Sequence, residues 1–491
     1  MNSKKKPDNE PYKRNVSLPP YYAKLLCTLL ILMWHNMLQA QNKPWTLKDC
    51  ISRALRENVL LNQDIANNEL NKINYDQARA NQLPNLSFTD QHSFNFGHST
   101  GTTGNQYSTA NIPGINSSVT LYNGQKNTNL VKENKLYYEA GNLYIEKLKN
   151  DLTLNVIAAY TQVLYTNEAV NIAQAQIDAT NEHLNYTERY VKAGSLPESS
   201  LLQMRAQLAT DKAAKTEAEN QLQLAKVALM QLMELPITPD FDIVRPDEKE
   251  LFADANMTSG EIYHVAEGFL PEVKSAAIKT KAAETGLMIS KAGLYPKLTL
   301  SGNIGSSYSS ANSLISYQTI TSTGHIGYLA DNPGAIVDGP LSKTITNTAN
   351  YPFFRQLNDN LGEGISVNLT VPIFNNKIYR NEIRRSDIAI RVAKLNERLV
   401  KNQLRKTIEA AYTDQQAASK NYVATKEQLA SEELSYHNIT VKFKAGVINT
   451  TDYFVERSIY NKAQIAQLQA KYQYQYKTRI LNFYLNNPIT D

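Results

Sequence analysis

The second half of this chain repeats the first, and the repeat limits the folds that are available to it. The run Ala-Ala-Tyr-Thr at 158–161 returns at 410–413, which is a displacement of 252 residues. The same displacement relates Lys-Ala-Gly at 192–194 to 444–446, Asn123 to Asn375, and Pro236 to Pro488. A constant register over so long a stretch indicates two similar structural modules. It excludes a division into unrelated catalytic and regulatory halves.

The displacement is not constant along the whole chain. Upstream, the segment 82–86 matches 294–298 at a displacement of 212, so the second copy carries 40 additional residues. These residues lie before Asn375, at about 309–361. Their Ser, Thr, Asn, Gly and Pro content predicts a long surface loop.

The N-terminus has the pattern of an export signal. Basic residues precede an apolar run at 23–33, and Ala40 offers a small residue for cleavage, so we expect a signal peptide over 1–40. A retained membrane anchor is the alternative, although the apolar run is short for a bilayer span. Lipidation of Cys27 is not expected, because no small residue precedes it. The mature chain would then hold only Cys50, which excludes a disulfide framework.

The first copy, 41–250, is expected to hold a helix, a β-hairpin at 85–122, a long helix at 125–193 and a helix at 199–234. Thr46 is the expected N-cap of the opening helix, which runs to about Asn81. The hairpin follows from alternating apolar and small polar residues. A helix of 69 residues is about 100 Å long, which requires other helices to pack along it.

The second copy, 251–491, is expected to contain the same elements in the same order. A helix at 261–294 precedes a hairpin at 297–374 that contains the long loop 309–361. Its second strand, 364–374, alternates apolar and polar residues, as a lipid-facing barrel strand does. A long helix at 375–445 and a helix at 450–486 follow.

This arrangement resembles the outer-membrane efflux protein family, of which TolC is typical. The resemblance rests on Leu-Tyr-Asn-Gly at 121–124, Val-Pro-Ile-Phe-Asn at 371–375 and Lys-Ala-Gly at both helical turns, and it covers nearly the whole mature chain. It implies a mixed α and β membrane protein. Three protomers would each give four strands to a 12-stranded β-barrel, continued by a long α-helical barrel. Four strands cannot close a transmembrane barrel, which starts at about eight strands.

The residues show no catalytic chemistry, so we expect no enzyme, no cofactor and no metal site. The seven histidines do not form a His-Glu-x-x-His motif, and His92 and His98 are expected to be loop or lumen residues. The net charge of +5 is scattered, which excludes a nucleic-acid stripe.

The two helical turns are the expected functional sites. Gly194 and Gly446 suit a positive φ that ends a helix, and Ser199 or Ser200 and residues 450–452 suit N-caps of the next helices. The resemblance implies that these turns form a periplasmic tip where an adaptor protein docks. The residues concerned are Ala193, Gly194, Ser195, Ala445, Gly446 and Val447.

The family also closes this tip with polar and charged residues. Asp452 lies six residues after Gly446, where the family carries an acid, and Ser200 is its counterpart in the first copy. Glu456 and Arg457 supply further charge, so these four residues are the candidate gate. Helix capping is the alternative role for Asp452.

The resemblance implies a passive export channel located in the outer membrane, with its helical barrel in the periplasm. Its partners would be two further copies of the chain, outer-membrane lipid, a periplasmic adaptor, and an inner-membrane pump of the RND or ABC type. A periplasmic coiled-coil adaptor or scaffold is the alternative, but it does not explain two helical hairpins with alternating strands. An uptake porin fits less well, because most of the sequence is helical.

Overall fold

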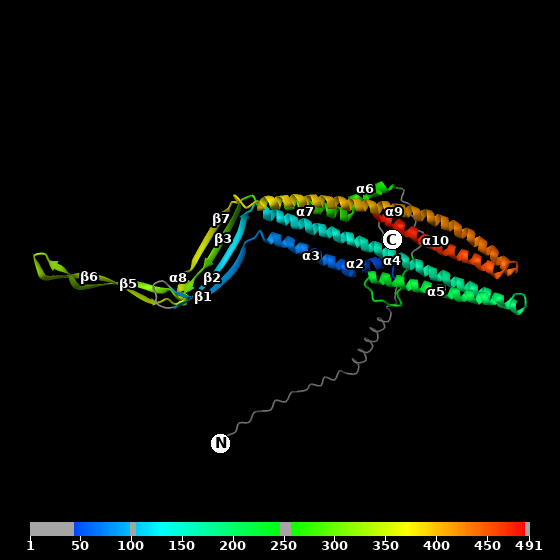
Figure 1. Ribbon diagram of the computed structural model, residues 1–491, viewed down its shortest axis with the longest axis horizontal. Helices are drawn as coiled ribbons and strands as arrows, with labels where there is room; N and C mark the ends of the chain where they lie inside the picture. The colour runs from blue at the N-terminus through cyan, green and yellow to red at the C-terminus, as the bar shows by residue number, and fades with distance from the viewer. Residues whose placement is uncertain (1–43, 99–104, 246–256, 487–491) are drawn as a thin grey trace, which may run out of the picture. The chain divides into compact units, whose positions relative to one another are not determined.

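The computed structural model describes residues 44–98, 105–245 and 257–486 (Figure 1). The expected signal peptide lies outside the described residues. The chain forms two compact units. Of the described residues, unit 1 comprises 44–62, 148–245, 257–268 and 404–486, and unit 2 comprises 63–98, 105–147 and 269–403. Each unit takes residues from both halves of the sequence, so the division at 250 describes the sequence repeat and not the compact units.

Two pairs of helices have matching lengths. Helices α4 (Lys126–Lys192) and α9 (Ile378–Lys444) each have 67 residues, and α5 (Glu198–Leu232) and α10 (Thr450–Tyr484) each have 35. All four bounds differ by 252 residues between the members of a pair.

The single glycine of α4, Gly141, permits a close approach of α3 to α4, because a Cβ there would lie 1.8 Å from Asn68 Oδ1 on α3.

The helices that open the two copies are each broken in two, where a single helix was expected. The first copy has α2 (Leu47–Glu57) and α3 (Val59–Ala80), and the second has α6 (Ser259–Phe269) and α7 (Pro271–Ala292). Pro271 at the start of α7 forces Leu270 into an extended conformation. Asn58 is also extended, and its side chain accepts a hydrogen bond from Leu61 N at 3.0 Å. Thr46 is confirmed as an N-cap, with a complete capping box to Asp49.

Unit 2 contains an antiparallel sheet in the order β1-β2-β3-β7. The strands are β1 (Asn85–His98), β2 (Asn105–Tyr122), β3 (Lys297–Gly305) and β7 (Gly362–Thr370), while a short β4 (Tyr308–Ser309) pairs with β2. The strand expected to reach residue 374 ends at Thr370, two residues before Pro372, which has no N–H to donate. Strands β1 and β7 form the two outer edges.

Four helices of unit 2 contact one another in the same order as the strands to which they connect. Asn68 on α3 donates to Asn142 on α4 at 2.7 Å, and Ser275 on α7 donates to the Ala140 carbonyl of α4 at 2.9 Å. Thr280 on α7 then donates to Glu397 on α9 at 2.9 Å. The row is therefore α3-α4-α7-α9, with α3 and α9 outermost.

The segment expected to be a long loop, 309–361, has regular structure instead. Strands β5 (Ser313–Leu329) and β6 (Asn332–Asn350) form a hairpin, and helix α8 (Phe353–Asp359) follows it. The reason is the β-branched content of the two runs, since Ile and Thr suit strands even among Ser and Asn. The fully buried Gln356 of α8 joins the two ends of the hairpin. Its Nε2 donates to the carbonyls of Ser309 at 3.0 Å and Tyr351 at 2.8 Å.

The core of unit 1 lies where α2, α4, α5 and α6 contribute fully buried side chains. These include Cys50, Ile157, Leu229 and Ile262. The hydroxyl of Tyr160 donates to the Val244 carbonyl, which ties the segment after α5 to α4. Among the described residues, no helix is both long and apolar enough to cross a membrane.

Candidate functional site

The turn between α4 and α5 is a Schellman motif centred on Gly194. Its φ is +72°, a value that glycine adopts without a steric penalty. Gly194 N donates to the Val191 carbonyl at 3.0 Å, and Ser195 N donates to the Tyr190 carbonyl at 2.9 Å. These two bonds satisfy carbonyls that the end of a helix leaves free.

The turn between α9 and α10 has the same geometry. Gly446 has a φ of +73°, and its N donates to the Phe443 carbonyl at 3.0 Å, while Val447 N donates to the Lys442 carbonyl at 3.0 Å. The N-caps of the next helices differ from the expectation. Asn449 caps α10 by accepting from Asp452 N at 2.8 Å, whereas Pro197 precedes α5 with no side-chain cap. The expected caps, Ser199 or Ser200 and 450–452, lie within the first turns of these helices.

All six residues expected at the docking tips are exposed: Ala193, Gly194, Ser195, Ala445, Gly446 and Val447. A Cβ at Gly194 or Gly446 would meet no heavy atom of a described residue within 4 Å, apart from the adjacent residues in the chain. The helices that carry the turns contact each other, because Tyr186 Oη on α4 donates to the Lys444 carbonyl on α9 at 2.6 Å. The glycines therefore shape the backbone and leave open space beside it.

Aromatic side chains pack behind the turns in unit 1. The His183 ring of α4 lies 4.9 Å from the Tyr453 ring and 5.9 Å from the Phe443 ring, measured between centroids. Burial, followed by the positive charge of Lys444, lowers the pKa of His183 to about 4. His183 is therefore neutral at neutral pH, as its apolar neighbours require.

The four residues of the candidate gate lie in four different environments. Ser200 is buried, while Asp452 is exposed and interacts with the N-cap Asn449. Glu456 accepts a hydrogen bond from Ser435, and Arg457 is only 3% exposed. No hydrogen bond or ion pair joins any two of these four residues, all of which lie in the described part of the chain. These residues were expected to lie together near the turns, but they do not form one cluster in the structure.

Arg457 instead forms a buried cluster, here called the clasp, with residues that no sequence pattern indicated. Its Nη2 on α10 lies 3.0 Å from Asp211 Oδ2 on α5 and donates to the Gln176 carbonyl of α4 at 2.7 Å. Asp211 also accepts hydrogen bonds from the Thr180 hydroxyl and, at 2.8 Å, from Gln207 Nε2. The clasp therefore links α10 to both helices of the first helical hairpin.

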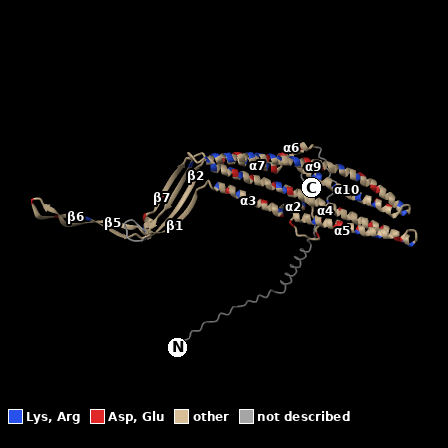
Figure 2. Cartoon of the chain, viewed as in Figure 1, with Lys and Arg blue, Asp and Glu red and all other residues tan. Residues whose placement is uncertain are grey.

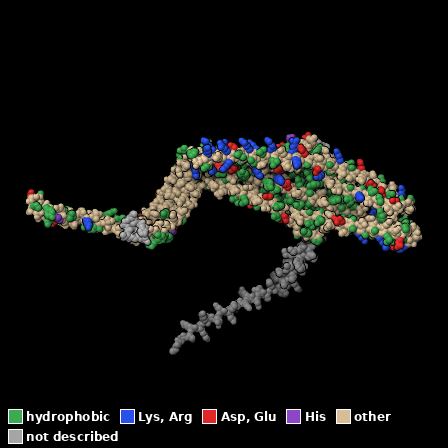
Figure 3. Space-filling model, viewed as in Figure 1, with side chains coloured by type: hydrophobic (Ala, Val, Ile, Leu, Met, Phe, Trp, Pro, Cys, Tyr) green, Lys and Arg blue, Asp and Glu red, His purple; other side chains and the backbone are tan. Residues whose placement is uncertain are grey.

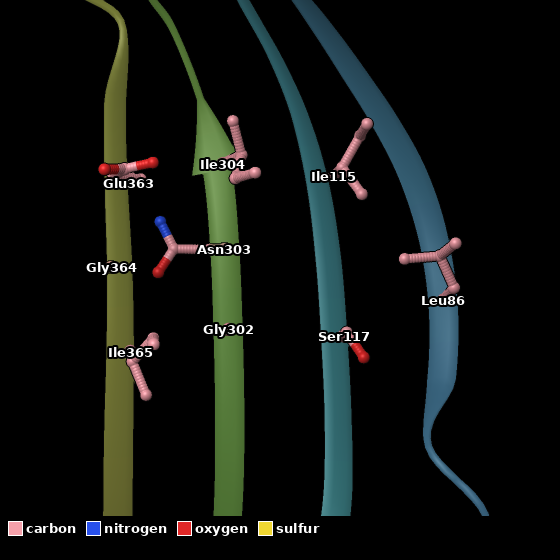
Figure 4. A pocket seen from close by; sticks show the side chains of 9 residues that line it. All are labelled: Leu86, Ile115, Ser117, Gly302, Asn303, Ile304, Glu363, Gly364 and Ile365. Atoms are coloured by element: carbon pink, nitrogen blue, oxygen red, sulfur yellow. The ribbon is translucent and has the colours of Figure 1, made fainter.

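The sheet of unit 2 has one apolar and one polar face. Leu86, Ser117, Gly302 and Ile365 form one row across the four strands by their register. Leu86 and Ile365 are 76% and 85% exposed. A cavity of about 620 Å³ lies beside Gly302, which has no side chain, and its lining combines Leu86, Ile115, Ile304 and Ile365 with the polar Ser117, Asn303 and Glu363 (Figure 4). The opposite face of β1 carries only uncharged polar side chains: Asn85, Ser87, Thr89, Gln91, Ser93 and Asn95. Such a sheet is suited to lipid on one side and water on the other.

His92 lies on the apolar face of β1 and shares a small polar group there. Its Nε2 lies 3.5 Å from Asp90 Oδ2 and 3.0 Å from Asn111 Nδ2. The side chain of His98 is outside the described residues. Among the described residues, no group of three or more His, Cys, Asp or Glu side chains is arranged to hold a metal ion.

Comparisons with known proteins agree with this geometry. The model of the family described as outer membrane efflux protein matches residues 50–234 and 263–487. The pyoverdine export outer membrane protein OpmQ of Pseudomonas putida is 27% identical over 193 residues, which cover 38% of this chain and 39% of the relative. This chain therefore matches about two fifths of the length of that relative.

Solved structures of similar fold cover most of the chain. A crystal structure of CusC has a TM-score of 0.71 at 16% identity and covers 90% of this chain and 92% of that chain. The outer membrane protein VceC from Vibrio cholerae has a TM-score of 0.69 at 16% identity, with coverage of 90% and 96%. At these identities the likeness shows the fold alone.

Proposed function

Because the chain belongs to the outer membrane efflux protein family, we propose that it is a passive channel through which an export system discharges its cargo across the outer membrane. The observation that carries this proposal is the sheet of unit 2, with an exposed and mainly apolar face and an opposite face of mainly uncharged polar side chains. The channel performs no reaction and uses no cofactor, so its barrel serves as a duct. A separate pump, of the RND or ABC type, supplies the energy for transport.

The proposed channel is a homotrimer. Strands β1 and β7 leave their outer edges unpaired within the described chain, and exposed edges of this length invite pairing with another chain. Joining β7 of one protomer to β1 of the next is a head-to-tail contact, which closes into a ring when the rotation fits. Three copies of the four main strands give a 12-stranded barrel, which places the apolar face in lipid and the polar face around the lumen.

The two glycine turns are proposed to dock a periplasmic adaptor. All six tip residues are exposed, and the open space beside Gly194 and Gly446 would allow a partner backbone to approach closely. The matching lengths of α4 and α9, and of α5 and α10, support two similar tips per protomer. A trimer would then present six similar tips to the adaptor.

We further propose that the clasp of Arg457 and Asp211 keeps the helical end of the channel closed. It joins α10 to the hairpin of α4 and α5, so these helices cannot separate while it is intact. Ser200, Asp452 and Glu456 would then contribute to the gate by position and not by contact with Arg457. The relative named for pyoverdine export supports export as the direction of transport. It does not assign a cargo to this chain.

Two measurements test the channel. Outer-membrane extracts should contain a trimer that converts to monomer on heating, and the purified protein should conduct ions across planar bilayers. A monomer recovered from the soluble periplasmic fraction would refute the proposal and favour an adaptor or scaffold. Adaptor docking is tested separately, by crosslinking from Gly194→Cys or Val447→Cys in native membranes. Capture of no adaptor at either position would exclude docking at these turns while leaving the channel intact.

A further inference from the structure

The positive charge was expected to be scattered, but it is concentrated in the first part of helix α9. Residues 377–406 contain ten Lys or Arg against three Asp or Glu, a net charge of +7, whereas the whole chain has +5. The corresponding residues of α4, 125–154, have a net charge of only +1. Figure 2 shows the Lys and Arg positions as blue segments of the α9 ribbon, and Figure 3 shows basic side chains along the edge of the molecule where α9 lies. The charge is therefore not a shared property of the two long helices.

Part of this charge has no ion-pair partner among the described residues. Lys394 pairs with Glu284 at 3.6 Å, and Lys401 pairs with Glu397 at 3.4 Å. In contrast, Arg384, Arg391 and Arg398 are exposed and make no ion pair with any described residue. They recur every seven residues, so they form one row along the helix.

The arginine row lies beside an exposed apolar seam, whose Val392 also borders a cavity that α9 shares with α4 and α7. Ile388, Val392, Leu395 and Leu399 recur at spacings of four, three and four residues and are 51% to 65% exposed. Arg391 immediately precedes Val392, and Arg398 precedes Leu399. This is the arrangement of a coiled-coil seam with a flanking row of charge, and such a row selects the partner helix and its orientation.

Helix α3, at the other end of the helix row, carries a matching pattern of opposite charge. Val59, Ala66, Leu70 and Ile73 recur at spacings of seven, four and three on its exposed side, and the three larger ones are 59% to 61% exposed. Glu69 precedes Leu70, and Asp76 follows Glu69 by seven residues. Both acids are exposed and make no ion pair with any described residue.

The apolar and charged residues of α9 can contact those of α3 only when the two helices belong to different protomers. Within the chain, α4 and α7 separate α3 from α9. Helix α3 runs toward β1 and α9 runs away from β7, so joining β7 to the β1 of another copy would set α9 antiparallel to the α3 of that copy. In an antiparallel pair, the flanks that precede the seam residues lie on the same side. The arginine row of one copy therefore faces the acidic row of the next.

The rows also begin at similar distances from the sheet. Asp76 and Glu69 lie four and eleven residues before the end of α3 at Ala80, and Arg384 and Arg391 lie six and thirteen residues after the start of α9 at Ile378. We infer that Arg384 and Arg391 of α9 pair with the Glu69 and Asp76 row on α3 of a second copy, alongside the joined apolar seams. This inference rests on the proposed trimeric channel. The apolar seams supply affinity, while the charge rows determine which helix faces which and in what direction.

Site-directed crosslinking tests this pairing in the full chain. Glu69→Cys combined with either Arg384→Cys or Arg391→Cys, treated with a short bismaleimide, should give covalent dimers and trimers on denaturing gels. Glu69→Cys with Ala389→Cys is the matched control, because Ala389 lies on the opposite flank of the same seam. A native trimer that crosslinks only through the control pair overturns the inference and leaves the channel standing. A monomer overturns both.

Charge exchange tests the role of the rows. Arg384→Glu with Arg391→Glu should lower the temperature at which the trimer dissociates, and adding Glu69→Arg with Asp76→Arg should restore it. The monomer fold is checked separately by circular dichroism of each variant. If the fourfold variant dissociates as readily as the twofold variant while its helix content is unchanged, the two rows do not face each other.

Discussion

The buried clasp allows a quantitative test of how unit 1 is held together. The side chains of Arg457 and Asp211 are 3% and 5% exposed, and their closest nitrogen and oxygen atoms are 3.0 Å apart. Removing one member of such a pair leaves a buried charge without its counter-ion, which typically costs about 3 to 5 kcal/mol. Asp211→Ala should fall in this range, because it leaves the Arg457 guanidinium with only the Gln176 carbonyl as acceptor.

Replacing both members should cost much less than the sum of the single changes. Asp211→Leu with Arg457→Met exchanges the ion pair for apolar contact, and such exchanges are often neutral or stabilising by about 1 to 4 kcal/mol. Urea unfolding followed by tryptophan fluorescence measures these changes, since Trp45 lies in the same unit and packs near Phe241. A double-mutant cycle then isolates the pair from the other contacts of each residue.

The same variants test the gate. If the clasp keeps the channel closed, each single variant should conduct more than the wild type in planar bilayers. Additive losses of stability in the cycle would show that the two side chains do not interact. Unchanged conductance together with a large coupling energy would assign the clasp a purely structural role.

Three further outcomes follow from the described contacts. Since burial lowers the pKa of His183 to about 4 from an unfolded value near 6.5, its contribution is complete above about pH 6.5 and is lost as the pH falls toward 4. The loss should be about 3 kcal/mol, and pH-dependent urea unfolding of His183→Gln should lack it. Gly194→Ala and Gly446→Ala should each cost about 1 kcal/mol in thermal unfolding because of their positive φ, whereas Gly260→Ala, at an ordinary φ with open space, should not destabilise the protein. Gln356→Leu leaves the Ser309 N–H and the Tyr351 carbonyl without their Gln356 partners, at about 1 to 3 kcal/mol each, while the Ser309 carbonyl keeps its bond from Asn312 N. This variant should open 309–361 to limited proteolysis before the sheet is cut.

The long helices could be read from the sequence because their determinants are local. An apolar spacing without proline predicted 125–193 and 375–445, and the structure has helices over Lys126–Lys192 and Ile378–Lys444. The break before Pro271 had a visible signal, since proline restricts the residue that precedes it. The break at Asn58 had a weaker one, because asparagine both caps helices and occurs within them.

The candidate site was less predictable because its contacts join distant residues. The positive φ of Gly194 and Gly446 followed from glycine at the end of a long helical pattern. The partner of Arg457 did not, because Asp211 is 246 positions away and lies among ordinary helical residues of α5. Similarly, a Ser- and Thr-rich composition concealed the hairpin of β5 and β6, whose strands are defined by pairing with each other and not by an apolar core.

The attachment of that hairpin has a practical consequence. One buried side chain, Gln356, holds both of its ends, so its length is uncoupled from the register of the four main strands. Residues near the hairpin turn, between Leu329 and Asn332, can then be exchanged for an epitope or a fluorophore acceptor without moving the sheet. The same uncoupling would let natural variants lengthen, shorten or lose the hairpin independently of the rest of the chain. The hairpin can therefore be replaced as a unit while the residues that attach it to the sheet stay unchanged.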